Sequence, residues 1–324
     1  MCNVCLVRTV VTFVMRTRAW TSLGLFLAAY PLVQADSLAK AIEAARKEAN
    51  VPGMSIAVVK DGEVVLVQGF GLRDVARRLP VGPRTAFCIG SSSKAFTAWL
   101  VQLAAHEGKL ALSDSPRKHV PDFQLFDKAA NERMTVEDLL CHRSGLPRTD
   151  IAWYSGKFDR KEILQLLAKC EPSAPFRGAW QYQNVMFMVA GMVAESALGK
   201  PYADLLEERI FSPLGMRESV SEFDAWSKIK DAAVGYSPSP KGTPNPVAQR
   251  KNLDAVAPAG SIVSNAEDMA QWVRFQLGRG ELGGKRIVPA ALVEDSWKSR
   301  MPMTPMVGMR SEERRVGKEC RSRW

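Results

Sequence analysis

The feature that most constrains the fold is a β-rich segment that comes before a long and mainly helical one. Residues 54–59 and residues 63–70 are rich in apolar side chains and are separated by Asp61 and Gly62, a pair that favours a two-residue hairpin turn. Two strands alone are only marginally stable in water. We therefore predict an α/β (α+β) fold, in which an antiparallel sheet is flanked by helices and joined to a mostly helical part.

Helical patterns dominate the rest of the chain. They occur in residues 36–50, 91–106, 134–140, 161–169, 185–198, 202–210 and 266–277. Thr135 and Asn265 are suited to cap two of these helices, and Gly199 is suited to end a third. Four prolines make residues 237–249 a predicted surface loop. Because strand signals are sparse before residue 255, we expect the partner strands of the hairpin after residue 280.

The N-terminal residues have the features of an export signal. Two arginines follow Met15, the better of the possible start residues, and Leu23–Leu32 is an apolar run too short to span a membrane comfortably. Small residues precede Asp36. The alternative is a membrane anchor formed with the apolar residues before Met15, but the arginines interrupt it. We predict that residues 1–35 are removed on export, leaving a periplasmic or secreted protein without a stable membrane span.

The distribution of charge argues against a nucleic-acid partner. The chain has 44 Lys and Arg against 34 Asp and Glu. Residues 1–35 and 310–324 together hold nine of these basic residues and three of the acidic ones. The rest is nearly balanced and has no basic stripe interleaved with aromatic side chains. We expect a small-molecule or peptide substrate as the partner, and the oligomeric state stays open.

Cysteine and histidine spacings argue against a metal site or a disulfide framework. Cys88, Cys141 and Cys170 are the cysteines between the two ends of the chain, an odd number without metal-ligand spacing. We expect buried thiols, with one disulfide pair among them left open. The three histidines also lie far apart. Of these, His142 is expected to brace a loop, with a functional role as the alternative, and we predict no metal and no cofactor.

Ser91 and Lys94 are the candidate nucleophile and base. The pattern Ser-x-x-Lys occurs four times in the sequence, but only at Ser91 does it follow an apolar stretch and open a long apolar helix. Residues three apart on a helix share a face, and burial among apolar side chains lowers the pKa of a lysine. A neutral amine beside a hydroxyl can activate that hydroxyl as a nucleophile.

A second candidate pair lies directly before another apolar helix. Tyr182 is the only one of the five tyrosines that has an asparagine, Asn184, two positions later. Residues two apart in an extended segment point the same way. Near Lys94, the phenol could shuttle a proton and the amide could bind a substrate carbonyl. The alternative is a core tyrosine followed by an asparagine that caps the helix.

Together these motifs resemble those of the serine β-lactamase and penicillin-binding-protein superfamily. The Tyr-x-Asn form is similar to the class C branch, with its D-aminopeptidases, D-alanyl-D-alanine carboxypeptidases and esterases. Other stretches that look like family phrases, in the family's order, are Phe87–Ser91, Asp138–Pro147, Ile210–Met216 and Pro258–Ser264. Residues 171–176 resemble the peptidase-like subgroup.

The resemblance implies a β-lactamase/transpeptidase-like fold and an acyl-enzyme mechanism. Ser91 would attack an amide or ester carbonyl, and Lys94 and Tyr182 would share the proton transfers, with the identity of the base left open. Asn184 would bind the substrate. The leading function is a serine hydrolase of the D-residue peptidase or carboxypeptidase type, with a carboxylesterase or a class C-like β-lactamase as alternatives. A non-catalytic penicillin-recognising binding module is the alternative outside the enzymes.

The third motif of the family has no counterpart in the C-terminal part of the sequence. Relatives carry Lys- or His-x-Gly on a strand that supplies the second N–H of the oxyanion hole, the first being that of Ser91. Residues 310–324 instead resemble the translation of a sequencing adapter, with a natural basic tail as the alternative. We therefore expect a truncated chain that lacks the C-terminal strands of the sheet and is insoluble or nearly inactive as written.

These expectations define the predicted domain organisation. The export signal occupies residues 1–35, and residues 310–324 form a non-native tail. One β-lactamase-related domain, residues 36–309, lies between them. Its α/β part comprises residues 36–90 and 256–309, and residues 91–255 form its mostly helical part.

Overall fold

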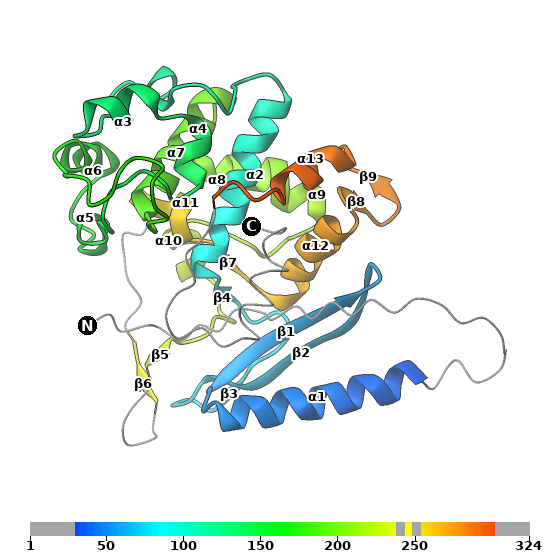
Figure 1. Cartoon of the computed structure of the whole chain (residues 1–324). Helices are drawn as coiled ribbons and strands as arrows, with labels where there is room; N and C mark the ends of the chain where they lie inside the picture. The colour runs from blue at the N-terminus through cyan, green and yellow to red at the C-terminus, as the bar shows by residue number, and fades with distance from the viewer. Residues whose placement is uncertain (1–29, 238–243, 248–253, 302–324) are drawn as a thin grey trace.

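The computed structural model describes residues 30–237, 244–247 and 254–301. Figure 1 shows an antiparallel sheet with a long helix along one face and a larger group of helices on its other side. The mixed α/β fold with an antiparallel sheet that the sequence predicted is confirmed. None of the helices in these residues is both long and apolar enough to cross a membrane.

The main sheet is the predicted hairpin with one short additional strand. Strands β1 (Gly53–Lys60) and β2 (Glu63–Asp74) pair antiparallel across a turn at Asp61 and Gly62, whose φ angles are +52° and +84°. Two successive positive φ values are those of the hairpin turn whose twist matches that of the strands. Strand β3 (Leu79–Pro80) pairs with the far end of β2. The third strand therefore comes from the chain directly after the hairpin.

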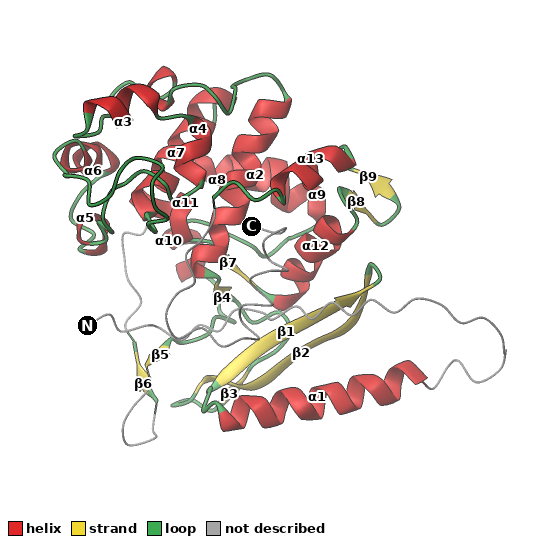
Figure 2. Cartoon of the chain, in the orientation of Figure 1, coloured by secondary structure: helices red, strands yellow, loops and turns green. Residues whose placement is uncertain are grey.

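Six further short strands form three antiparallel pairs in the described residues (Figure 2). They are β4 (Phe87–Cys88) with β7 (Val263–Ser264), β5 (Tyr236–Ser237) with β6 (Asn245–Pro246), and β8 (Glu281–Leu282) with β9 (Lys285–Arg286). The β5–β6 pair begins one residue before the predicted surface loop of residues 237–249, and in the described residues each of its strands is two residues long. Strand β8 packs on a helix and pairs with β9, so the expectation that strands after residue 280 join the hairpin is wrong for the described residues.

Helices cover both faces of the sheet. Helix α1 (Tyr30–Glu48) packs along β2, and helix α12 (Ala266–Leu277) packs mainly against β1. The buried side chains between α12 and the sheet are Ala57, Val59, Ala266 and Ala270. Because three of these four are alanines, the helix and the sheet can approach closely.

Helix α1 begins earlier than the sequence predicted. It starts at Tyr30, so it runs across the position before Asp36 where we expect cleavage. Its C-terminal end is fixed by Arg46, whose Nη1 donates to the carbonyl of Val51 at 2.6 Å. The rest of the predicted export signal, residues 1–29, lies outside the described residues.

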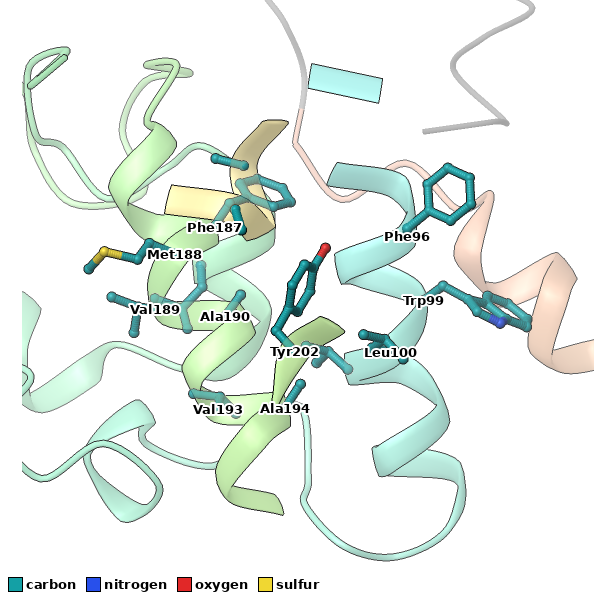
Figure 3. Close-up of a cluster of buried hydrophobic side chains, with 14 of the residues drawn as sticks. Phe96, Trp99, Leu100, Phe187, Met188, Val189, Ala190, Val193, Ala194 and Tyr202 are labelled. Atoms are coloured by element: carbon teal, nitrogen blue, oxygen red, sulfur yellow. The ribbon is translucent and has the colours of Figure 1, made fainter. Parts of the chain in front are cut away.

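Helices α2 (Ser93–His106) and α7 (Asn184–Leu198) form the centre of the helical part. Figure 3 shows their buried side chains, with the side chain of Tyr202 lying between the two helices. The Phe96 ring of α2 stacks on Trp272 of α12 with 4.3 Å between the centroids. This contact joins the helical part to the helix that covers the sheet.

The remaining helices surround these two. They are α3 (Lys128–Arg133), α4 (Val136–Leu140), α5 (Ile151–Tyr154), α6 (Arg160–Leu167), α8 (Tyr202–Leu206), α9 (Ser212–Leu214), α10 (Phe223–Ser227), α11 (Ala257–Gly260) and α13 (Ala290–Ser296). The predicted caps Thr135 and Asn265 are confirmed, because each side chain accepts a hydrogen bond from a backbone N–H of the helix that follows. Gly199 ends α7 with a φ of +73°. The helix predicted over 202–210 is α8 followed by one π-helical turn.

Close packing holds α11 against α2 and α7. Thr97 Oγ1 on α2 donates to the carbonyl of Pro258 at 2.6 Å and lies 2.7 Å from the hydroxyl of Tyr202. A Cβ atom added to Gly191 on α7 would come within 2.2 Å of the Pro258 ring. Only glycine permits this approach, and it places α11 beside the N-terminal end of α2.

Asp138 joins three segments of the helical part. Its carboxylate is fully buried and accepts hydrogen bonds from Arg143 Nε at 2.5 Å, Arg177 Nη2 at 2.7 Å and the backbone N–H of Thr135 at 2.9 Å. Burial alone would raise the pKa of this carboxyl. The hydrogen bonds from Arg177, Thr135 and Arg143 outweigh burial, so the pKa of Asp138 is lowered.

We predict that Asp138→Ala lowers the free energy of unfolding by about 3 kcal/mol, because it leaves two guanidinium groups without their buried partner. The midpoint of urea denaturation at pH 7 measures this loss. Since the folded-state pKa is lowered, the contribution of Asp138 is complete above the unfolded-state value of about 3.9 and is lost as pH falls through the folded-state pKa. The exposed Asp122→Ala is the control, with a change within about 0.5 kcal/mol; equal midpoints for the two variants would refute the role of Asp138.

Candidate active site

Ser91 lies at an exposed position where a strand turns into a helix. Strand β4 is followed by Gly90, whose φ of +53° favours glycine, and by a 3₁₀ turn over Gly90–Ser92 that leads into α2. The predicted α-helix therefore begins two residues after Ser91. Ser93 Oγ donates to the carbonyl of Gly90 at 2.7 Å and accepts from the N–H of Ile262 at 3.1 Å, which fixes the turn.

Lys94 is buried beneath Ser91 with three hydrogen-bond acceptors around its amine. Its residue is 8% exposed. The Nζ atom lies 3.1 Å from Ser91 Oγ, 2.8 Å from Asn184 Oδ1 and 2.6 Å from the carbonyl oxygen of Ala259. These acceptors come from the 3₁₀ turn, α7 and α11, so the position of the amine depends on the packing of all three.

Tyr182 approaches Ser91 from the extended segment before α7. Its hydroxyl donates to Ser91 Oγ at 2.6 Å. The ring stacks on His142 with 4.4 Å between centroids, and His142 Nδ1 accepts the backbone N–H of Gln183 at 3.0 Å. His142 thus braces the segment that carries Tyr182, as the sequence predicted, and it also contacts the candidate site.

Asn184 is the first residue of α7 and links the lysine to an acidic side chain. Its Oδ1 accepts from Lys94, and its Nδ2 donates to Asp150 Oδ1 at 2.9 Å. The capping role that we considered for Asn184 falls instead to Gln183, whose Oε1 accepts from the N–H of Val185 at 3.2 Å. The amide of Asn184 is therefore mainly engaged with Lys94 and Asp150.

Burial dominates the protonation of these groups. Burial lowers the pKa of Lys94 to about 7, while Asp150 acts to raise it and Arg148 to lower it. Burial also raises the pKa of Tyr182 above its ordinary value of 10.0 and lowers that of His142 to about 4. At neutral pH the phenol and the imidazole are therefore uncharged, and the amine is present in both protonation states.

This arrangement can activate a hydroxyl. A neutral Lys94 can donate its two hydrogens to Asn184 Oδ1 and the carbonyl of Ala259. Its lone pair then faces Ser91 Oγ, the third group in contact with Nζ. A base within 3.2 Å of a hydroxyl meets the geometric requirement for general-base catalysis.

The structure brings together all four residues that the sequence singled out and adds others that it did not. Asp150, Arg148 and the carbonyl of Ala259 were missed. Ala259 lies within a stretch that resembled a family phrase, which was an available signal. No local pattern marked Asp150, because its link to Asn184 spans 34 positions of the chain.

The cysteines lie outside this cluster of contacts. Cys141 and Cys170 are free thiols, so no disulfide forms among the three cysteines whose pairing we left open. All three are half-buried, and burial raises the pKa of Cys141 to about 11. Within the described ranges, no three His, Cys, Asp or Glu side chains are grouped as metal ligands.

Sequence comparisons relate the chain to curated proteins. Residues 38–309 match the family model described as Beta-lactamase. The unguisins hydrolase ungD' of Aspergillus campestris (strain IBT 28561) is 35% identical over 244 residues, which cover 71% of this chain and 45% of the relative. The protein flp of Staphylococcus aureus (strain MW2) is 28% identical over 245 residues, covering 73% and 47%. The chain spans about half the length of the curated relatives it matches.

Solved structures show the same fold. The octameric penicillin-binding protein homologue from Pyrococcus abyssi has a TM-score of 0.66 at 29% identity, covering 83% of this chain and 60% of its own. A class C β-lactamase has a TM-score of 0.69 at 24% identity, covering 84% and 72%, a likeness that concerns the fold alone. Because the family model matches residues 38–309, which are most of the chain, the chain belongs to the β-lactamase family, as its motifs predicted.

Proposed function

We propose that this protein cleaves amide or ester bonds through an acyl-enzyme on Ser91. The observation that carries this proposal is the convergence on one oxygen: Ser91 Oγ lies 3.1 Å from Lys94 Nζ and 2.6 Å from the Tyr182 hydroxyl. Ser91 is an exposed residue, whereas Lys94 beneath it is buried. A substrate carbonyl can therefore reach the nucleophile from solvent.

Lys94 acts as the base in this proposal, and Tyr182 acts as the proton donor. The lowered pKa of Lys94 supplies a neutral amine at pH 7, while the raised pKa of Tyr182 keeps the phenol protonated. Lys94 takes the proton of Ser91 as Oγ attacks the carbonyl carbon. Tyr182 delivers its proton to the leaving group, and the proton that Lys94 took from Ser91 then restores the phenol. In the second step water attacks the acyl carbon and gives a proton to Lys94, which returns it to Ser91 Oγ as the acid leaves.

The proposed substrate class is a peptide or amide that contains a D-residue. The peptidase-like residues 171–176 support it, and the name of the unguisins hydrolase among the relatives supports hydrolysis. A carboxylesterase and a class C-like β-lactamase use the same nucleophile and remain alternatives. A penicillin-recognising binding module would be acylated without turnover.

The decisive substitution is Ser91→Ala in the protein expressed from the complete source gene. We expect it to abolish hydrolysis of a D-alanine anilide, a short-chain p-nitrophenyl ester and a chromogenic cephalosporin, whichever of these the wild-type protein cleaves. Ser115→Ala, in another Ser-x-x-Lys of this chain, is the matched control and should retain wild-type rates. Hydrolysis that survives in Ser91→Ala would overturn the assignment, and stoichiometric acylation without turnover would favour the binding module.

The role of Lys94 predicts a pH dependence. Because only the neutral amine can accept a proton, the acylation rate should rise as pH increases through about 7, the pKa of Lys94, and then level off. Lys94→Met should lower the plateau by about 10²–10⁴-fold, the usual contribution of general-base catalysis. Stopped-flow acylation by a p-nitrophenyl ester from pH 5 to 9 measures both quantities. A rate independent of pH over this range would exclude Lys94 as the base.

The oxyanion hole gives a further expectation. We propose that the backbone N–H of Ser91 is one donor, and that the Lys- or His-x-Gly strand, which the C-terminal part of this sequence lacks, supplies the other. Loss of one donor slows turnover by about 10²–10³-fold, so the 324-residue chain should be nearly inactive. Sequencing the source DNA through Arg310 and comparing kcat for the complete gene product and for this chain tests the idea. Equal kcat values would contradict it.

Export is proposed on the sequence of residues 1–35 alone. A mature N-terminus at Asp36, found in the periplasm or the medium, would support it. An intact N-terminus on a membrane-bound product would argue for an anchor.

A further inference from the structure

Asp150 lies behind Asn184 and contacts the candidate site through the amide of that residue. Its Oδ1 accepts from Asn184 Nδ2 at 2.9 Å and from Trp153 Nε1 at 3.2 Å. Its Oδ2 accepts from Arg148 Nε at 2.5 Å. The carboxylate is one-quarter exposed, and it stands at the start of the short helix α5. Three donors from separate side chains therefore hold one acidic group behind the amide.

The amide of Asn184 can satisfy both of its neighbours in one orientation only. An amide has an acceptor end and a donor end. The amine of Lys94 needs an acceptor, and the carboxylate of Asp150 can only accept. We propose that Asp150 is a positioning residue, which fixes the Asn184 amide so that Oδ1 faces Lys94 and the amine is directed at Ser91. This inference rests on the function proposed above and adds a residue to it.

The orientation of the Asn184 amide determines the direction of the remaining hydrogen-bonding position on Lys94 Nζ. With Asn184 Oδ1 and the Ala259 carbonyl as fixed acceptors, the remaining position of Nζ faces Ser91 Oγ. If the amide flipped, the Nδ2 donor would face the amine of Lys94 in place of the Oδ1 acceptor, and two N–H donors would point at each other. The lone pair of Lys94 would then be drawn toward the amide and away from the nucleophile.

Charged and titratable groups face Lys94 from several elements. Tyr182 and His142 are neutral at pH 7 because burial raises the pKa of the first and lowers that of the second. Asp150 and Arg148 carry opposite charges and shift the pKa of Lys94 in opposite directions. Arg148 also lies over the Tyr182 ring, with 5.3 Å from its guanidinium carbon to the centroid. Asp150 and Arg148 thus form an ion pair, and substitution can neutralise its members one at a time.

Three substitutions separate orientation from charge. Asp150→Asn keeps an acceptor for Asn184 but removes the charge, so the acylation plateau should stay within about threefold while its pH midpoint falls. Asp150→Ala removes the acceptor as well, and its plateau should fall at least about tenfold, the effect of one hydrogen bond to a charged group. Arg148→Gln removes the opposite charge, and its midpoint should rise.

The pH midpoints of Asp150→Asn and Arg148→Gln should shift in opposite directions, and this difference is the most discriminating result. Asp150→Asn and Arg148→Gln break the same ion pair, so a purely structural role would change both variants alike. Trp153→Phe is the matched control, because it removes another hydrogen bond to Asp150 and leaves Asn184 its partner. It should keep the wild-type plateau and midpoint. Midpoints that move together, or a plateau unchanged in Asp150→Ala, would overturn the inference.

A second measurement makes the inference independent of turnover. NMR titration of the ¹³Cε-labelled side chain of Lys94 reports its pKa directly in each variant, with Lys94→Met identifying the resonance. The pKa should fall in Asp150→Asn and rise in Arg148→Gln. If Ser91→Ala keeps full activity, the proposed function fails while this titration still decides the inference. If the titration shows no shifts in a protein that loses activity with Ser91→Ala, the inference alone fails.

Discussion

The candidate site depends on one buried amine. Moving an ammonium group out of water costs several kcal/mol unless hydrogen bonds and charges compensate, and Lys94 is only 8% exposed. The structure compensates with one acceptor each from the 3₁₀ turn, α7 and α11. The compensation is incomplete, because the pKa of Lys94 still falls to about 7. An amine that is half deprotonated at neutral pH is available as a base.

The packing of α2, α7 and α11 brings these three acceptors to one point. Gly191 allows the Pro258 ring to lie against α7, and Thr97 holds the carbonyl of Pro258 from α2. The next carbonyl, that of Ala259, then lies within 2.6 Å of Lys94. Core packing, which by itself would only stabilise the helices, in this way sets the geometry around the nucleophile.

Local chemistry made part of this structure predictable. Asp61 and Gly62 favour the hairpin turn whatever surrounds them, and Thr135 and Asn265 cap helices through atoms only a few positions away. Ser91 and Lys94 could be paired because three positions along a helix share a face. The pairing held although Ser91 lies in a 3₁₀ turn before the α-helix.

Long-range and backbone partners were not predictable in this way. A carboxylate such as Asp150 carries no mark of the residue it meets 34 positions away, and any residue supplies a carbonyl like that of Ala259. Strand β3 was missed because Leu79 and Pro80 form a two-residue pairing too short to give an alternating pattern. The contacts of Asn184 were not predicted either, because the sequence suggested substrate binding or capping, whereas the amide contacts Lys94 and Asp150.

The central claim is that a covalent intermediate forms on Ser91. Mass spectrometry of the protein quenched in acid during turnover of a D-alanine ester or a penicillin measures this directly. We expect one acyl group per chain, located by peptide mapping on Ser91 and absent when Ser91 is replaced by alanine. An unmodified Ser91 during active turnover, or an acyl group on another residue such as Lys94, would contradict it.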